Sequence, residues 1–408
     1  MKPSAALQTL AAQAREHLSG HILPFWCGPA VDHRNGGWMA WLANDLTPDR
    51  TQPKGLIVHA RILWAFSAAH QARPDATYAA MAGRAFDFLM GRFWDTQHGG
   101  AFWQINDVGA VLDDSKKIYG QAFCIYALAE FHRAFGNAAA LARAREFFEL
   151  IERHAHDAQF GGYLEVCRRD WSAADAEARL SDKDMNEKKS MNNHLHMLEA
   201  YTTLYRVWRE PRVAERLREL IELFLTKILD ARTLHLHHFF DAQWSVRSDT
   251  YTFGHDIEAT WLVCEAAEEL RDAELLSRVR CIALSMAEVT LNEALTPEGA
   301  LCYEGKAGQI IDAGQECWPQ AEALVGFVNA YELSRDEKFL NAAQRVWNYI
   351  QERLVDRVHG EWFWRINPDG QPDPKLPKVS EWKGPYHASR ACLEIARRLE
   401  HFTATTNH

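Results

Sequence analysis

"QHGGAFWQINDVG" (residues 97–109) and, close behind it, "KIYGQAFCIYALAEFHRAF" (residues 117–135) form the stretch that decides the fold. The first segment joins a pair of glycines to alternating apolar residues, which is typical of a turn between short extended segments. The second is apolar nearly all round, and a helix of that kind is buried on every side. The two together predict an extended loop that leads directly into a buried helix.

The glycine-and-aromatic segment recurs five more times along the chain. The other copies are "RNGGWMAWLAND" (34–45), "QFGGYLEVCRRDW" (159–171), "TLHLHHFFDAQW" (233–244), "PEGALCYEGKAG" (297–308) and "VHGEWFWRINPDG" (358–370). Successive copies lie about sixty residues apart, and the fourth has no glycine. We expect each copy to form a small β-hairpin or extended loop.

Two helix-patterned stretches separate successive copies, which makes twelve helices in all. Those that precede a copy carry charge and an apolar stripe, as in "RVAERLRELIELFLTKIL" (212–229), whereas those that follow one are apolar on all sides. One set should therefore lie outside and the other inside. The pattern predicts an all-α protein, an (α/α)6 barrel of twelve helices with short β-hairpins at one end. We see no linker and expect residues 1–408 to form a single catalytic domain.

Composition excludes several functions. The net charge of -10 disfavours nucleic acid as a partner, because phosphates would be repelled. The sequence contains no membrane-spanning apolar run, and its N-terminus lacks the pattern of a signal peptide. The eight cysteines form no C-x-x-C pair and mostly lie in apolar segments, as expected of a reducing compartment. We therefore expect a cytoplasmic protein without a membrane partner, a monomer with a dimer as the alternative.

Polar residues gather where the inner helices begin. In "FGHDIEATW" (253–261), His255 and Glu258 lie three positions apart and so share one helix face. All six inner helices should begin at the same end, where these residues would converge on a ligand cavity. The other polar or aromatic residues at those starts are Arg61, Tyr119, Gln121, Asn192, His194, His196, Trp318, Gln320, Glu322, Tyr386, His387 and Arg390. The alternative for any one of them is a structural role, as a buried polar side chain whose hydrogen bonds are made within the protein.

Histidine is the most frequent choice at these starts. The partial positive charge of a helix N-terminus disfavours imidazolium, and a neutral histidine can act as a base near neutral pH. A metal site is the first alternative, but His194 and His196 point about 200° apart on a helix and cannot share an ion. A glycosidase is the second, with Glu258 and Glu322 as its carboxylates. That alternative leaves the histidines unexplained.

Long ordered motifs resemble a known family. They are "KGLIVHARILWAFSAA", "KKIYGQAFCIYALAE", "SDKDMNEKKSMNNHLHMLEAY", "FGHDIEATWL", "CWPQAEALVGF", "GEWFWRINPDG" and "WKGPYHASRACLE". Together they resemble the N-acylglucosamine 2-epimerase superfamily, and most closely its cellobiose 2-epimerase branch. The resemblance implies an (α/α)6 barrel that needs no metal or other cofactor. It implies inversion of C2 in the reducing-end glucose or mannose unit of β-1,4-linked disaccharides such as cellobiose, lactose and mannobiose.

The same resemblance implies catalytic roles for particular residues. His255 and His387 would be the two acid/base groups, with His196 and Glu258 as their support. Arg61 would bind the oxygens near the reacting carbon. The reaction would open the ring, remove the C2 proton to give a cis-enediolate, and return a proton to the other face. Two histidines on different helices would serve those two faces.

Substrate contacts are implied in the same way. Asn192 would bind sugar oxygens beside the reacting carbon, and Tyr119, Asp184 and Trp318 would make further contacts. Trp382 would be a platform for the second sugar. A polar insertion before the third inner helix, residues 172–190, could fold over the mouth of the barrel.

One departure from the family pattern concerns specificity. "WKGPYHAS" has Gly384 and Ala388 beside His387, where a bulkier residue and an asparagine are expected. A monosaccharide mannose 2-epimerase or a mannose aldose–ketose isomerase is therefore the alternative activity. A glycan-binding protein that kept the barrel without its chemistry is a third possibility, disfavoured by the intact set of histidines, Glu258 and Arg61.

Overall fold

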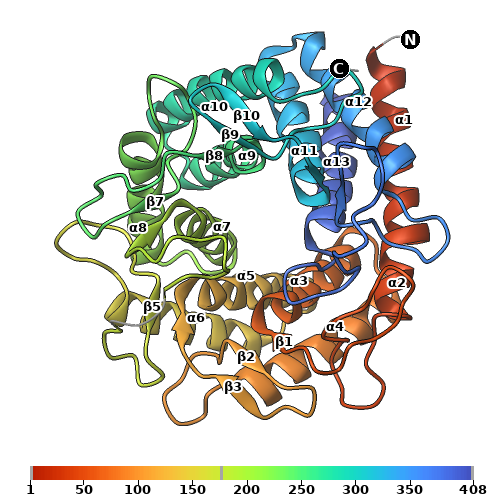
Figure 1. Ribbon diagram of the computed structural model, residues 1–408. Helices are drawn as coiled ribbons and strands as arrows, with labels where there is room; N and C mark the ends of the chain where they lie inside the picture. The colour runs from red at the N-terminus through yellow and green to blue at the C-terminus, as the bar shows by residue number, and fades with distance from the viewer. Residues whose placement is uncertain (1–2, 175–177, 406–408) are drawn as a thin grey trace.

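The computed structural model describes residues 3–174 and 178–405 and forms two concentric rings of helices (Figure 1). Six helices form the inner ring: α3 (Leu56–Ala72), α5 (Ile118–Phe135), α7 (Met191–Val207), α9 (Phe253–Leu270), α11 (Cys317–Ser334) and α13 (Tyr386–Thr405). The outer helices are α1 (Pro3–His17) continued by η1 (Leu18–Ile22) and α2 (Leu23–Cys27), α4 (Ala76–Phe88) with η2 (Leu89–Phe93), α6 (Ala138–His154), α8 (Pro211–Leu223) with η3 (Phe224–Ile228), α10 (Ala273–Glu293), and α12 (Glu337–Tyr349) with η4 (Ile350–Leu354).

The ring closes on itself. Each inner helix packs against the next one in chain order, and α13 packs against α3. Each inner helix also packs against the outer helix that follows it, and α13 completes the set by packing against α1. The predicted (α/α)6 barrel is confirmed. Within the described residues, no helix has the length and apolar character that a membrane span requires.

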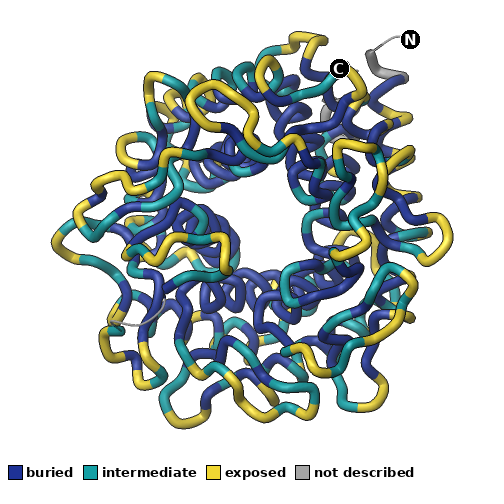
Figure 2. Tube along the Cα trace, in the orientation of Figure 1, coloured by how far each residue is buried: buried dark blue, intermediate teal, exposed yellow. Residues whose placement is uncertain are grey.

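Burial follows the predicted division between the two rings. The first fourteen residues of α5, Ile118 to Phe131, are all buried. On the outer helix α8, the buried residues recur at Val213, Leu217, Leu220, Ile221 and Leu223, which is one helical face. Figure 2 shows the same contrast, with dark inner walls and exposed residues concentrated on the outer loops. The inner helices can be apolar on all sides because they are buried both toward the outer ring and toward the barrel interior.

Short strands lie at one end of the barrel. They are β1 (Lys54–Gly55), β2 (Gln104–Ile105), β3 (Val111–Asp113), β4 (Lys116–Lys117), β5 (Val166–Cys167), β6 (Lys189–Ser190), β7 (Phe239–Phe240), β8 (Tyr251–Thr252), β9 (Glu304–Lys306), β10 (Gln309–Asp312), β11 (Gln315–Glu316) and β12 (Arg365–Ile366). The predicted hairpins are only partly correct. Five antiparallel pairs, β1–β2, β4–β5, β6–β7, β8–β9 and β11–β12, join the residues before one inner helix to the next glycine-and-aromatic segment. These pairs therefore hydrogen-bond each repeat to the next one.

Buried ion pairs fix these segments to the inner helices. Lys54 Nζ lies 2.6 Å from an Asp32 carboxylate oxygen and donates to the Gly36 carbonyl oxygen at 2.8 Å. Asp32 precedes the glycine turn and Lys54 precedes α3, so the pair sets the entry angle of that helix. The same arrangement recurs in three more repeats, as Lys116 with Asp95, Lys189 with Asp157, and Lys378 with Asp356.

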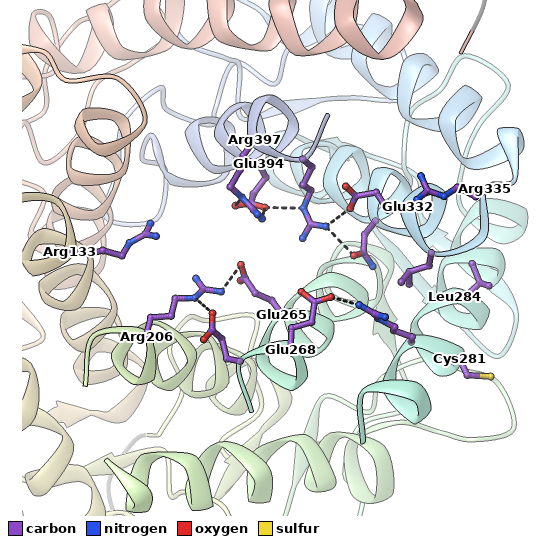
Figure 3. Close-up of a pocket in the computed structure, with 15 residues that line it drawn as sticks. Arg133, Arg206, Glu265, Glu268, Cys281, Leu284, Glu332, Arg335, Glu394 and Arg397 are labelled. Atoms are coloured by element: carbon purple, nitrogen blue, oxygen red, sulfur yellow. Dashed lines mark hydrogen bonds and ion pairs between the residues drawn. The ribbon is translucent and has the colours of Figure 1, made fainter. Parts of the chain in front are cut away.

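The opposite end of the barrel, where the inner helices finish, holds a cavity of about 990 Å³ (Figure 3). Its charged side chains pair with one another. Arg206 contacts Glu265 and Glu269 at 2.8 Å, and Arg398 contacts Glu332 at 2.7 Å. Arginines suit this end because helix C-termini carry partial negative charge. The network holds the inner helix ends together.

Candidate active site

A second cavity, of about 400 Å³, opens at the end where the inner helices begin. That volume is typical of small-molecule sites. All ten residues to which the family resemblance gave a role line it: Arg61, Tyr119, Asp184, Asn192, His196, His255, Glu258, Trp318, Trp382 and His387. The repeat explains most of this convergence, because equivalent positions at the starts of the inner helices face one space. Asp184 and Trp382 come from the segments that precede α7 and α13.

His387 lies in the first turn of α13 and is held by a carboxylate. Its Nδ1 atom is 2.7 Å from Oε1 of Glu322 on α11. Burial lowers the pKa of His387 well below its usual value, and the charges of Arg61 and Arg390 lower it further. The ring is therefore neutral at pH 7. The same Oε1 of Glu322 accepts from Arg390 at 2.7 Å, so this oxygen is an acceptor, Nδ1 of His387 carries the proton and Nε2 keeps its lone pair.

His255 lies in the first turn of α9 and is held by a hydroxyl group. Its Nδ1 atom is 2.5 Å from Oγ1 of Thr252, and its ring lies 4.7 Å from that of Trp318. Burial and then the neighbouring His238 lower the pKa of His255 well below its usual value. Gly254 permits the close approach of Trp318, because a Cβ there would lie 2.5 Å from the indole. His255 and His387 are thus two neutral imidazoles in one cavity.

A charge cluster lies beneath the cavity. Three buried carboxylates, from Glu199, Glu258 and Glu322, surround the single guanidinium of Arg390. Burial and then the charge of Glu322 raise the pKa of Glu258 to about 7. Burial would also raise the pKa of Glu199, but the charge of Arg390 and a hydrogen bond from His196 hold it at about 2. Burial also raises the pKa of Glu322. Glu258 and Glu322 are therefore the two carboxyl groups of this cluster whose pKa is raised.

Within the part of the chain that the structure describes, neither Glu258 nor His196 has a hydrogen bond to His255 or His387. Among the described residues no hydrogen bond joins Glu258 to His255, and Oε2 of Glu258 is buried without a partner. His196 bonds through Nδ1 to Glu199 at 2.9 Å. The hydrogen-bond partners of the two histidines come instead from Thr252 and Glu322. Glu258 and His196 belong to the cluster around Arg390.

Arg61 projects from α3 toward the same space. One of its terminal nitrogens donates to the Tyr119 hydroxyl at 2.9 Å, and the other donates to the Trp382 carbonyl oxygen at 3.4 Å. The guanidinium lies 4.5 Å from the Phe123 ring. Its Nε is buried and has no partner among the described residues. This fixed positive charge is suited to stabilise negative charge on a bound molecule.

The predicted insertion forms part of the wall. Leu180, Ser181, Lys183 and Asp184 line the cavity; residues 175–177 of the same segment lie outside the described residues. Asp184 closes a turn of the segment by accepting hydrogen bonds from the backbone of Leu180 and Ser181 at 3.2 and 2.9 Å. Asn192 contributes a buried Oδ1 without a hydrogen-bond partner among the described residues.

His194 is not part of the site, although the sequence placed it at the cavity. Its Nε2 accepts from the backbone N–H of Tyr163 at 2.9 Å, and its Nδ1 donates to the Ser190 carbonyl oxygen at 2.6 Å. Gln121 and Gln320 bind the backbones of Ala101 and Leu301 in the same way. These side chains face the glycine turns and anchor them to the inner helices.

Comparisons with known proteins identify the family of this chain. The family model described as N-acylglucosamine 2-epimerase (GlcNAc 2-epimerase) matches residues 37–391. A cellobiose 2-epimerase of Bacteroides fragilis is 41% identical over 390 residues, which cover 95% of this chain and 99% of that relative. One of Dictyoglomus turgidum is 38% identical over 394 residues, which cover 96% of this chain and 100% of that relative.

The chain belongs to the N-acylglucosamine 2-epimerase family. The solved structure of a cellobiose 2-epimerase from Bacillus thermoamylovorans B4167 superimposes with a TM-score of 0.90 at 38% identity. The superposition covers 96% of this chain and 100% of that one. The protein is therefore a carbohydrate epimerase of the isomerase class, similar to the cellobiose 2-epimerases.

One group in this family member has the spacing of a metal site. One ligand atom each from Glu258, Glu322 and His387 lies within 4.8 Å of the others. Both carboxylates, however, already contact the guanidinium of Arg390. We therefore assign the charge balance of this group to Arg390.

Several lining or supporting residues were missing from the sequence prediction. Glu199 and Thr252 each lie three positions from a predicted histidine, so helix spacing was a usable signal for both. Glu322 and Arg390 were recognised at the inner-helix starts, but Glu322 had a role only in the glycosidase alternative and Arg390 had none. Tyr303 also lines the cavity, and it lies in a glycine-and-aromatic segment where no spacing rule singled it out.

Proposed function

We propose that this protein inverts C2 of the reducing-end glucose or mannose unit of β-1,4-linked disaccharides such as cellobiose, lactose and mannobiose. The observation that carries the proposal is the pair of neutral histidines, His255 on α9 and His387 on α13, which face one cavity beside Arg61. The names of the relatives give the substrate class. The two opposed proton-transfer steps of an epimerisation require such a pair.

The first step opens the sugar ring. A hemiacetal opens when the O1 proton is removed and a proton is delivered to the ring oxygen, which breaks the C1–O5 bond and leaves an aldehyde at C1. Either histidine can take the first proton, and Glu258 is suited to give the second because its pKa is raised to about 7, first by burial. The aldehyde makes the C2 proton acidic.

The second step removes that proton. One neutral histidine takes the C2 proton at Nε2, and the C2–H electron pair moves to form the C1–C2 double bond of a cis-enediolate. The negative charge on O1 is stabilised by the guanidinium of Arg61. Charge of this kind develops only during the reaction, so a fixed cation placed beforehand lowers the barrier.

The last step restores the carbon on its other face. Rotation about the C2–C3 bond presents the opposite side of C2, and the second histidine, which carries the proton taken from O1, delivers it there. The double bond reverts to the aldehyde, and the ring closes as O5 attacks C1. The O5 proton returns to Glu258, and O1 takes up the proton that the first histidine removed from C2, so both histidines are neutral again. The proton delivered to C2 came from a hydroxyl group that exchanges with solvent. Solvent hydrogen therefore enters C2.

The test is an NMR time course in deuterium oxide with cellobiose, mannobiose, mannose and N-acetylglucosamine side by side. We expect epimeric disaccharides labelled with deuterium at C2. A ketose as the main early product would replace the proposal with an aldose–ketose isomerase. His255→Ala and His387→Ala should each lose activity by about a hundredfold or more while staying folded. His359→Ala, at a half-exposed histidine outside the cavity, is the control.

A further inference from the structure

The two histidines differ in what holds Nδ1. A carboxylate holds His387, whereas the hydroxyl of Thr252 holds His255. A hydroxyl has one donor and can also accept, so it suits either tautomer of an imidazole. Thr252 alone therefore does not fix the tautomer of His255. To act as a base toward the cavity, His255 needs its lone pair on Nε2 and its proton on Nδ1.

The buried side chain of His238, next to Thr252, determines the tautomer of His255. The backbone N–H of Thr252 donates to Nε2 of His238 at 3.1 Å, so this nitrogen is an acceptor. The same Nε2 lies 3.4 Å from Oγ1 of Thr252. Burial lowers the pKa of His238 to about 4, which keeps this ring neutral with its lone pair available. Since this nitrogen carries no proton, the Thr252 hydroxyl can bond to it only as a donor that shares the lone pair with the backbone N–H, and an oxygen lone pair then faces His255.

We infer that Thr252 and His238 are positioning residues that hold His255 in the tautomer with its proton on Nδ1 and its lone pair on Nε2. The chain of hydrogen bonds runs in one direction. The Thr252 backbone fixes the His238 tautomer, His238 orients the Thr252 hydroxyl, and the hydroxyl accepts from Nδ1 of His255. His255 then presents a basic Nε2, and its imidazolium form keeps the same acceptor after it takes a proton.

A cavity next to the active site supports this arrangement. A space of about 360 Å³, which the 178–187 segment also borders, is lined by His238, Thr252 and His255. His255 lines both this space and the active-site cavity, whereas Thr252 and His238 line this space and not the active-site cavity. They can act on its tautomer without touching the substrate, which is why we class them as positioning residues.

This inference rests on the proposed epimerisation, and its test separates the two. Each histidine serves one face of C2, so exchange of the C2 hydrogen without inversion reports on one histidine at a time. Cellobiose and its C2 epimer, each carrying deuterium at C2, are incubated separately in ordinary water. The early loss of deuterium is followed by NMR for wild type, Thr252→Val, Thr252→Ser and Glu322→Gln.

We expect Thr252→Val to slow deuterium loss by about tenfold to a hundredfold for one epimer and much less for the other. Glu322→Gln should show the opposite preference. Thr252→Ser keeps the hydroxyl and should retain most of the wild-type rate, and the KM of Thr252→Val should change little. Thr260→Val is the matched control, since it removes a buried hydroxyl of α9 whose one hydrogen bond among the described residues goes to the Ile257 carbonyl oxygen.

The outcomes are distinct. If Thr252→Val slows both epimers equally, or behaves like Thr260→Val, the positioning role is wrong while the epimerisation stands. If His255→Ala and His387→Ala leave deuterium loss unchanged, the proposed function itself is wrong. His238→Leu removes the acceptor without altering Thr252 and should reproduce the one-sided effect. A folded His238→Leu protein with wild-type exchange on both epimers would also overturn the inference.

Discussion

Nδ1 of His387 lies 2.7 Å from Oε1 of Glu322, and the same oxygen lies 2.7 Å from a terminal nitrogen of Arg390. One carboxylate oxygen therefore supports a candidate proton carrier and an arginine shared with two other carboxylates. Its negative charge favours the imidazolium that His387 forms when it takes a proton, although burial and Arg61 keep the resting ring neutral. Glu322 thus connects the proposed chemistry to the charge cluster beneath it.

Glu322→Gln should reduce kcat for cellobiose epimerisation by about tenfold to a hundredfold. The amide oxygen can still accept from Nδ1, but the charge that stabilises imidazolium is lost. Steady-state rates measured by NMR or coupled assay will check this. Glu332→Gln changes another carboxylate of the same helix, at the far end of the barrel, and should keep its rate. Equal rates in the two variants would contradict the role of Glu322.

The charge cluster also predicts a pH-dependent stability. The pKa of Glu258 rises from 4.5 to about 7 on folding, first through burial and then through the charge of Glu322. Between these values the folded protein binds more protons than the unfolded chain, so its free energy of unfolding falls as pH rises. Glu258→Gln is neutral throughout and escapes this loss, which is on the order of 1–3 kcal/mol.

Thermal unfolding at constant ionic strength will measure the effect. The Tm of Glu258→Gln minus that of wild type should become more positive from about pH 5 to about pH 8. A difference that stays constant, or that falls over this range, would show that Glu258 is already ionised at pH 5 in the folded protein.

The sequence predicted the ring and the cavity because the repeat encodes both. Six copies of one unit define where every inner helix begins, and equivalent positions in a closed ring must face one space. Hydrogen-bond partners were harder to predict. Arg390 meets Glu199 across 191 positions of the chain, and which rotamers bring them together depends on packing of the whole ring. The spacing of residues along one helix cannot predict a contact between residues so far apart in the chain.

The strands illustrate the same limit. Alternating apolar residues predicted extended structure in each glycine-and-aromatic segment, and the extended structure is present. The pattern cannot choose between a partner within the segment and one in the next repeat, because either pairing satisfies the backbone. Ring closure decides it, and the contact between Leu42 and Val379 joins the first repeat to the residues before α13.

Trp382 provides a test of disaccharide preference. Its ring lies 6.1 Å from Tyr119 and 5.9 Å from Trp103, and it lines the cavity from the loop before α13. If it is the platform for the second sugar, Trp382→Ala should raise the KM for cellobiose by about tenfold or more, because stacking on a sugar face is lost. The KM for mannose, which has no second sugar, should change by less than about threefold. A parallel rise for both substrates would place Trp382 at the reacting sugar instead.

The far end of the barrel should matter for stability and not for catalysis. Glu394 contacts Arg397 at 2.6 Å and Arg398 at 2.9 Å, and Arg398 continues to Glu332. Burial alone would raise the pKa of Glu394, but these two arginines lower it to about 2.

Glu394→Gln leaves two arginines at the inner helix ends short of negative charge, which should cost about 1–3 kcal/mol of unfolding free energy at pH 7. Because the folded pKa is depressed, the advantage of wild type over the variant should shrink as pH falls from about 4.5 toward about 2. Urea unfolding will measure the first effect, and the kcat and KM for cellobiose should stay at wild-type values. A folded Glu394→Gln variant with a large loss of kcat would show that the two ends of the barrel are coupled.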